Sequence, residues 1–223
     1  MINSPNPAHR MFLTDLREEY RLGGLTEQNC ETNPIVQFER WMKDAQAADL
    51  KEPNAMTLST ATSDGRPSGR VVLLKEVSDI GFVFYTNYHS RKSRELETNP
   101  FAALTFYWPE LERQVRAEGQ VRRVSRQQSE AYFQSRPKGS RLGAWASKQS
   151  EVLPDRASLD VKLRAVEAKY AETDDVPVPE FWGGYCLIPE TMEFWQGRTN
   201  RLHDRLQYRR KGENTWVVER LSP

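Results

Sequence analysis

The order of the strand-like and helix-like segments is the feature that most limits how this chain can fold. Short segments typical of β-strands occupy 56–124, with one short helix-like stretch among them, and recur over 184–221 after a helical region. The turn at 63–67 (Ser-Asp-Gly-Arg-Pro) is short enough to join Met56–Thr62 and Arg70–Lys75 as an antiparallel hairpin. Two blocks of strands with helices between them favour a mainly β fold, in which a closed antiparallel barrel carries flanking helices.

Capping residues and apolar spacing predict where the helices begin and end. We expect an N-terminal helical segment over about residues 1–50, made of Phe12–Tyr20 and a second helix that starts at Asn33-Pro34. Ser90 is placed to cap a short helix that ends near Asn99. The other predicted helices are Ser125–Ser135 and Leu159–Ala171, and the other predicted strands are Gly81–Thr86, Phe101–Trp108, Arg113–Val124, Gly184–Ile188, Met192–Trp195, His203–Arg210 and Thr215–Leu221.

Length and charge limit the organisation and the partners of the chain. Its 223 residues suit one domain, 1–223, because the proline-bearing connector 174–179 is too short for a domain linker. Lys and Arg number 32 against 31 Asp and Glu, so no overall positive field favours binding to nucleic acid or to an anionic membrane. Any anion binding must therefore depend on local groups of residues.

Signals for export, membrane insertion or metal binding are not found in the sequence. Residues 1–13 contain two prolines and a histidine where a signal peptide needs an unbroken apolar region, and no later apolar run approaches membrane-spanning length. Cys30 and Cys186 lie far apart, without a second pair of metal ligands nearby. We therefore expect a cytoplasmic protein with two reduced cysteines and no metal site.

The stretch 201–205 (Arg-Leu-His-Asp-Arg) is the densest group of candidate active-site residues. On a regular strand Arg201, His203 and Arg205 share one face, because side chains alternate between the two faces. Two guanidinium groups beside an imidazole suit an anionic, planar ligand, and histidine can exchange a proton near neutral pH. A solvated edge strand explains the same spacing equally well. The nearby Trp195 is either a flat surface for a ligand or a core residue.

Two further basic groups are candidates for binding phosphate. At Ser90-Arg91-Lys92 a helix start combines free backbone N–H groups with two cations, although an ordinary capped surface helix fits the same residues. Arg70 and Lys75 bracket the apolar run Val71, Val72, Leu73 and Leu74, which is typical of a strand covered on both faces. Arg70 and Lys75 are separated by an odd number of positions, so on a regular strand their side chains point to opposite faces.

Other polar residues form a looser set of candidates. Tyr132 and Arg136 share a helix face, and together with Ser140 they suit a phosphate monoester, although a helix-end cluster without a ligand fits as well. Gln114, Gln149 and Ser150 could hydrogen-bond a heterocycle, with a solvated position as the simpler interpretation. Arg17 and Tyr20 share a face of the first helix, where an ordinary surface helix is the simpler interpretation.

The run Glu193-Phe194-Trp195-Gln196, followed after four variable residues by 201–205, closely resembles the signature of the pyridoxamine 5'-phosphate oxidase family. The resemblance covers nearly the whole chain and includes a C-terminal signature region over about 180–223. Its other motifs are Arg17–Tyr20, Arg70–Lys75, Phe84–Asn87, Ser90–Lys92, Leu111–Gln114, Ser135–Pro137, Gly143–Trp145, Ser147–Ser150 and Phe181–Gly184. The family implies an FMN-binding split β-barrel that works as a homodimer, with FMN held between the subunits.

The resemblance also implies roles for individual residues. The FMN contacts of the family fall on Arg70, Val71, Val72, Leu73, Leu74, Lys75, Tyr85, Thr86, Arg91, Lys92, Gln114, Gln149, Ser150, Trp195 and Arg205. Its substrate contacts fall on Lys75, Tyr132, Arg136 and Ser140 for the phosphate, on Arg201 and His203 near the pyridine ring, and on Arg17 and Tyr20 as a cover. Arg201 and His203 are the residues expected to act in catalysis.

The implied reaction is the oxidation of pyridoxamine or pyridoxine 5'-phosphate to pyridoxal 5'-phosphate, with hydride passed to FMN and O2 reduced to H2O2. Two rival hypotheses are a non-catalytic flavin or pyridoxal-phosphate binding module on the same fold and a flavin reductase that uses a nicotinamide donor. The intact set of substrate-side residues argues against both, because a flavin carrier has no use for a second phosphate site.

Overall fold

A computed structural model describes residues 19–212 and 215–223. Its helices are α1 (Pro34–Ala47), α2 (Arg91–Thr98), α3 (Arg126–Ser135), α4 (Lys138–Ala146) and α5 (Arg156–Lys169), with short 3-10 helices η2 (Pro109–Leu111) and η3 (Thr199–Arg201). Its strands are β1 (Ala55–Ala61), β2 (Pro67–Leu73), β3 (Glu76–Ser78), β4 (Gly81–Asn87), β5 (Phe101–Trp108), β6 (Arg113–Arg123), β7 (Trp182–Gln196), β8 (Asp204–Arg210) and β9 (Trp216–Arg220). These strands form one sheet, and all their pairings are antiparallel.

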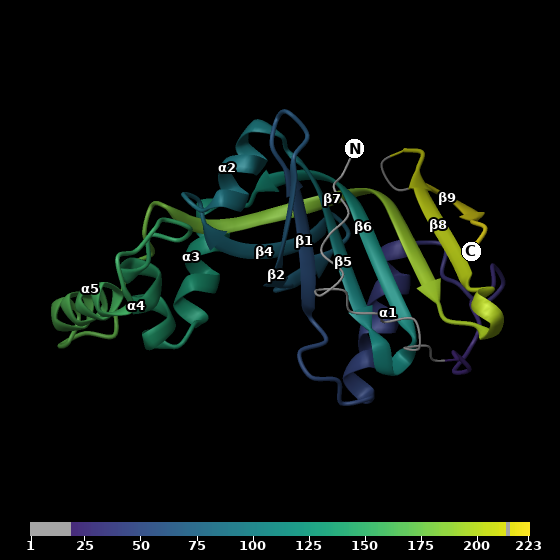
Figure 1. Ribbon diagram of the computed structural model, residues 1–223, viewed down its shortest axis with the longest axis horizontal. Helices are drawn as coiled ribbons and strands as arrows, with labels where there is room; N and C mark the ends of the chain where they lie inside the picture. Colours follow the sequence, from purple (N-terminus) through teal and green to yellow (C-terminus); the bar gives the residue numbers. More distant parts are fainter. Residues whose placement is uncertain (1–18, 213–214) are drawn as a thin grey trace, which may run out of the picture.

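The long strand β7 connects the two ends of the molecule. It pairs with β6 over nearly its whole length, whereas β4 pairs only with its first half and β8 only with its second half. In Figure 1, β7 runs from the side of α3, α4 and α5 to the side of β8 and β9. The register with β6 shifts between Glu118 and Gly119. A Cβ at Gly119 would overlap the carbonyl oxygen of Ile188, so glycine is needed where the strands cross this irregularity.

The curled sheet has a seam between its two end strands. The strand order β2-β1-β5-β6-β7-β4-β3 leaves β2 and β3 at the ends, and no ladder joins these two strands in the described part of the chain. The chain instead crosses the seam through Leu74 and Lys75, where the backbone N–H of Lys75 donates to the carbonyl of Val83 in β4 at 2.9 Å. The predicted split β-barrel with flanking helices is confirmed, and it is open at this seam rather than closed by a continuous ladder.

Helix α1 fills the interior of the curled sheet. The side chain of Asn33 accepts a hydrogen bond from the N–H of Ile35 and caps the helix, as the sequence predicts. Phe38 is fully buried, with its ring centroid 4.9 Å from that of Phe82 and 4.8 Å from that of Phe106. Large aromatic side chains at this spacing contribute strongly to a core, so α1 fixes the curvature of the strands around it.

Helices α3, α4 and α5 lie at one end of the molecule (Figure 1). They pack around the buried Trp182 in a second apolar cluster that contains Phe133, Leu142, Tyr170, Val176 and Val178. Helix α4 was not predicted from the sequence. In the structure Pro137 is the residue that precedes α4, a position where a fixed φ and a missing N–H do no harm.

Several other expectations differ from the structure in detail. The predicted strands Gly184–Ile188 and Met192–Trp195 form one continuous strand, β7, and the short strand β3 was not predicted. The expected helix Phe12–Tyr20 lies almost wholly outside the described residues, and its last residue, Tyr20, is not helical. In the part of the chain that the structure describes, no helix is both long and apolar enough to cross a membrane.

Candidate active site

A cavity of about 1000 Å³ opens between β2, β4, the start of α2 and the junction of α3 with α4. The sequence-predicted site residues that line it are Arg70, Val71, Val72, Leu73, Lys75, Tyr85, Thr86, Arg91, Lys92, Tyr132, Arg136, Ser140, Gln149 and Ser150. Leu74 does not line the cavity, because its side chain is buried in the main core. The structure therefore brings most of the predicted residues into one concave site, and their individual roles stay predictions.

The run Arg70–Lys75 is not covered on both faces in the single chain. β2 is an end strand of the sheet, and the side chain of Val71 is 67% exposed. The expectation of a strand buried on both sides is therefore wrong for one protomer. An apolar residue this exposed on an end strand is suited to contact with a ligand or with a second chain.

Lys92 lies at one end of the cavity and is the most buried of its cations. Its Nζ donates to the hydroxyl of Thr86 at 3.2 Å, to the hydroxyl of Ser90 at 3.4 Å and to Oε1 of Gln149 at 3.0 Å. Burial, assisted by the nearby charge of Arg70, lowers the pKa of Lys92 to about 8. An ammonium group held by three neutral oxygens retains its charge at pH 7 and favours an anion.

The start of α2 differs from the simple capped helix that the sequence suggests. Ser90 occupies the N-cap position, but its hydroxyl contacts the hydroxyl of Ser93 and accepts from Lys92 rather than capping the backbone. Next to it, Arg91 donates from Nε to Oε1 of Glu95 at 2.8 Å. Arg91 and Lys92 both face the cavity, so the helix start presents two cations there.

A second cationic group lies where α3 meets α4. The guanidinium carbon of Arg136 lies 4.9 Å from the ring centroid of Trp182, and its Nη1 is buried without a hydrogen-bond partner in the described residues. Burial lowers the pKa of Arg136. Tyr132 stacks on Tyr85, with 4.0 Å between the ring centroids, and Ser140 follows in the first turn of α4. A buried guanidinium donor with no partner is unfavourable unless a ligand accepts from it.

The remaining candidates form a separate group at the other end of β7. The ring of His203 lies 4.6 Å from that of Trp195, and the ring of Tyr20 lies 5.6 Å from each of them. Gln114 pairs with Trp195 across β6 and β7. This group does not line the cavity, and β7 spans 15 residues, which is on the order of 45 Å of extended strand. Arg17 lies outside the described residues.

The predicted strand row of Arg201, His203 and Arg205 is wrong. Arg201 belongs to η3, where it has a φ of 59°, and β8 begins only at Asp204. Arg205 is on β8, but its Nε donates to the buried carboxylate of Glu193 at 2.7 Å. The short helix replaces the alternation of a strand, so these three side chains are not equivalent members of one face.

Two cavity residues, Ser68 and Gly69, lie outside the motifs quoted from the sequence. Six others lie within those motifs but were given no role of their own: Asn87, Pro137, Gly143, Ala144, Ser147 and Trp182. Glu95, one turn of helix after Arg91, was also missed, although a glutamate four residues from a phosphate-site candidate is a readable signal for an ion pair. Within the described ranges no group of three or more His, Cys, Asp or Glu is placed to bind a metal ion.

Comparison with known proteins gives matches over almost the whole chain. Residues 42–170 match the family model described as pyridoxamine 5'-phosphate oxidase, and residues 182–223 match the model described as the pyridoxine 5'-phosphate oxidase C-terminal dimerisation region. A pyridoxine/pyridoxamine 5'-phosphate oxidase of Thermosynechococcus vestitus is 59% identical, covering 95% of this chain and 99% of its own. One from Neisseria gonorrhoeae is 56% identical, covering 96% and 100%.

A solved structure agrees with these matches. The crystal structure of PhzG from Burkholderia lata 383, in complex with tetrahydrophenazine-1-carboxylic acid, superposes with a TM-score of 0.83 at 35% identity, covering 89% of this chain and 98% of that one. The curled sheet, the cavity and the C-terminal group thus occur on a fold that this relative shares. The chain belongs to the pyridoxamine 5'-phosphate oxidase family.

Proposed function

We propose that this protein is an FMN-dependent oxidase that converts pyridoxamine or pyridoxine 5'-phosphate to pyridoxal 5'-phosphate, with O2 reduced to H2O2. The observation that carries the proposal is one cavity with a cationic group at each end, Arg91 and Lys92 at one and Arg136 at the other. A flavin mononucleotide and a phosphorylated vitamin each carry one phosphate, so their reaction needs two anion sites. The names of the relatives at 56–59% identity support the same activity. The cytoplasmic location stays a prediction.

The end of the cavity at α2 suits the phosphate of FMN. Lys92, Arg91 and Arg70 supply positive charge there, and the apolar side chains of 71–73 offer a wall for a flat ring system. When bound, FMN supplies the two-electron redox chemistry of the reaction. The residues of the chain bind the phosphate, orient the ring and exclude water from it.

The end of the cavity at α3 and α4 suits the phosphate of the substrate. The unpartnered Nη1 of Arg136 is a charged donor that a phosphate oxygen would satisfy. The hydroxyl groups of Tyr132 and Ser140 and the ammonium group of Lys75 line the same cavity and supply further donors. Binding at this remote phosphate would help to hold the reacting carbon in place.

We infer that two copies of the chain complete each site. The cavity and the group around Trp195 and His203 lie at opposite ends of β7, too far apart for one small ligand to touch both within a protomer. A twofold dimer can place the C-terminal group of one chain over the cavity of the other. The match of 182–223 to a dimerisation region supports this arrangement.

His203 is suited to act on the substrate as a neutral imidazole. Burial, assisted by the charge of Arg201, lowers its pKa. Its Nδ1 accepts a hydrogen bond from the backbone N–H of Arg198 at 3.1 Å, which leaves the proton of the neutral ring on Nε2. In the proposed site Nε2 would therefore donate to the substrate, and Arg201, whose guanidinium has no ion pair with the residues that the structure describes, would lie beside it.

Oxidation of a phenazine precursor is the second candidate function. The relative of known structure was solved with tetrahydrophenazine-1-carboxylic acid, which has a carboxylate and no phosphate. The second cationic group of this cavity favours the phosphorylated vitamin, because Arg136, Lys75, Tyr132 and Ser140 would otherwise face no phosphate. A non-catalytic flavin carrier or a reductase that uses a nicotinamide donor has no evident use for this group either.

The proposed function predicts a strong preference for phosphorylated substrates. The purified protein should bind FMN and consume O2 when pyridoxine 5'-phosphate is added. Its kcat/KM for unphosphorylated pyridoxine should be at least about a hundredfold lower, because two or more charge-assisted hydrogen bonds to the phosphate are lost. Oxygen uptake and H2O2 release measure the rates, and tetrahydrophenazine-1-carboxylic acid serves as the competing substrate. A protein that cannot be reconstituted with FMN, or that oxidises only the phenazine compound, would contradict the proposal.

The lowered pKa of Lys92 predicts a pH dependence of FMN binding. With a pKa of about 8 in the ligand-free protein, Lys92 is charged below pH 8 and loses its proton above it. Affinity for FMN should therefore be level between about pH 7 and 8, because a phosphate with a second pKa of about 6 is already mostly a dianion there. It should fall by up to about tenfold per pH unit above pH 8, because binding then requires proton uptake. Titrations with riboflavin, which lacks the phosphate, should stay nearly level over the same range. A Lys92→Ala variant should lose the pH dependence, and an unchanged slope would show that another group is responsible.

A further inference from the structure

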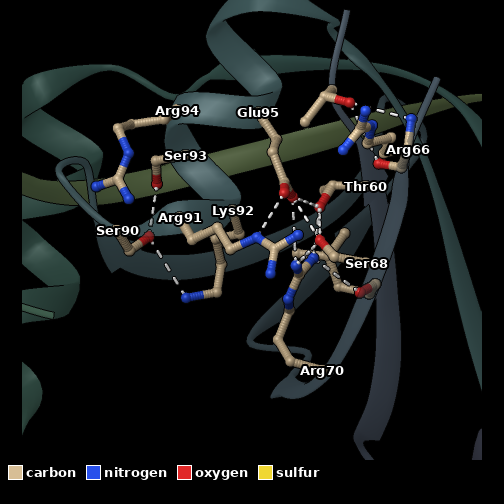
Figure 2. Close-up of polar contacts among 12 residues, drawn as sticks. Thr60, Arg66, Ser68, Arg70, Ser90, Arg91, Lys92, Ser93, Arg94 and Glu95 are labelled. Atoms are coloured by element: carbon tan, nitrogen blue, oxygen red, sulfur yellow. Dashed lines mark hydrogen bonds and ion pairs between the residues drawn. The ribbon is translucent and has the colours of Figure 1, made fainter. Parts of the chain in front are cut away.

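Glu95 is a buried carboxylate that does not itself line the cavity but contacts two cations that do, Arg70 and Arg91. It projects from α2 toward the hairpin of β1 and β2 (Figure 2), and its side chain is only 5% exposed. Oε2 accepts hydrogen bonds from the hydroxyl of Thr60 at 2.5 Å and from that of Ser68 at 2.6 Å. It also lies 3.4 Å from Nη2 of Arg70, and Oε1 accepts from Nε of Arg91 at 2.8 Å.

These contacts keep Glu95 ionised although it is buried. Burial opposes ionisation, but the hydrogen bonds from Ser68, Thr60 and Arg91 outweigh it and lower the pKa to about 2. Glu95 therefore acts as a fixed anion at any pH near neutrality. Its partners on three segments hold it in place, whereas the long side chain of Arg91 is 60% exposed and has no other hydrogen bond within the described residues.

We propose that Glu95 is a positioning residue that holds Arg91 and Arg70 in the orientation that binds the FMN phosphate, and so gives the protein its preference for FMN over riboflavin. The inference rests on the proposed function, because it takes FMN as the ligand of this end of the cavity. Glu95 would act only through the two arginines and would not touch the flavin.

The charge balance of the cluster agrees with this role. Arg70, Arg91 and protonated Lys92 carry three positive charges and Glu95 carries one negative charge, which leaves two positive charges. A phosphate monoester has a charge of about −1.5 to −2 at pH 7. Because Glu95 takes only Nε of Arg91, the two terminal nitrogens of that guanidinium stay available for phosphate oxygens.

Holding an arginine in place before the ligand arrives also favours binding. A free, exposed arginine must give up its side-chain freedom when it binds phosphate, and this loss weakens the affinity. Glu95 removes much of that loss for Arg91. The negative charge of Glu95 has the opposite effect, because it repels the phosphate. Removing the charge should therefore weaken FMN binding if the positioning of Arg91 dominates, and strengthen it if repulsion dominates.

The test compares FMN and riboflavin binding by apoprotein carrying Glu95→Gln. The amide cannot accept from Arg91 with one end and from Ser68 and Thr60 with the other, because one end is now a donor. We expect FMN affinity to fall by at least about tenfold, the effect of about one charge-assisted hydrogen bond, while riboflavin affinity stays within about twofold of the wild type. Glu97→Gln is the matched control, since Glu97 is on the same helix but is exposed and pairs with Arg123 rather than with Arg91 or Arg70.

A double-mutant cycle with Arg91→Ala identifies the route of the effect. If Glu95 acts through Arg91, Glu95→Gln should weaken FMN binding much less in the Arg91→Ala background than in the wild type. Glu95→Asp keeps the charge but shortens the side chain, and it should lower the ratio of FMN to riboflavin affinity as well. This variant gives the answer if Glu95→Gln does not show a cooperative thermal transition.

Three other results of the binding measurements would overturn the proposed role of Glu95. Unchanged or tighter FMN binding in Glu95→Gln would overturn the inference and show that repulsion dominates, with the proposed function intact. Equal loss of FMN and riboflavin affinity would also overturn it, because a general structural defect affects both ligands. A wild-type protein that binds neither flavin would overturn the proposed function, and this inference with it.

Discussion

Replacing Arg201 by alanine is expected to lower kcat/KM for pyridoxine 5'-phosphate by about ten- to a hundredfold, because a hydrogen bond to a charged group contributes roughly 1.5–3 kcal/mol. FMN should stay bound and the fold should be unaffected. Arg201 is exposed and makes no hydrogen bond or ion pair within the described residues, so the substitution removes no such contact there. Steady-state oxygen uptake and the absorbance of bound FMN measure the two effects separately.

Two further variants make this result specific. Arg201→Lys keeps the charge but not the planar fork of donors, so it should remain impaired. His203→Ala should also lower kcat/KM, since it removes the Nε2 donor that the hydrogen bond from the N–H of Arg198 to Nδ1 leaves free. A near-normal kcat/KM in Arg201→Ala, or a defect limited to lost FMN, would exclude a substrate-side role for this residue.

Mixed dimers are expected to recover activity that neither parent variant has. Arg136→Ala damages the cavity half of the proposed site and Arg201→Ala damages the C-terminal half. If each site takes one half from each chain, a heterodimer has one site with both changes and one site with neither. Heterodimers isolated with two different affinity tags should therefore show about half of the wild-type activity per dimer, well above either mutant homodimer.

The control for this experiment uses two changes in the same half. A heterodimer of Arg136→Ala with Lys75→Ala should show no recovery, because both residues line one cavity and each site then keeps one defect. If the Arg136→Ala and Arg201→Ala heterodimer is as inactive as its parents, each active site is built from a single chain. Activity should also depend on protein concentration below the dissociation constant of the dimer.

The strands and the capped helices were predictable because local rules decide them. Phe101–Trp108 was predicted with the bounds that the structure gives to β5, and Asn33 caps its helix with its side chain as expected. Motif resemblance also identified cavity residues on five separated segments. Spacing alone could not have grouped them, because β2, β4 and α3 are brought together by the curling of the sheet and by the packing of α3 on β7.

The features of the candidate site that could not be predicted from the sequence depend on tertiary structure and on irregular backbone. Arg201 follows Asn200, and both have positive φ values, 59° and 55°, so the regular alternation assumed for 201–205 does not exist there. Local patterns also do not show that the candidate residues form two groups at opposite ends of β7. The spacing of Arg91 and Glu95 indicates an ion pair, but nothing in the local sequence indicates that the carboxylate is buried against Thr60 and Ser68.

The pairing of β4 with β7 has a consequence for how the protein is made. Tyr85 lies opposite Gly184, about a hundred residues later in the chain, so β4 leaves the ribosome long before the strand that covers its edge. Until Trp182–Leu187 has been synthesised, the apolar stretch 82–84 has an open edge that can associate with other nascent chains. A chain terminated before Trp182 would keep the β1–β2 and β5–β6 pairings but would be removed by aggregation or proteolysis rather than accumulate as a stable fragment.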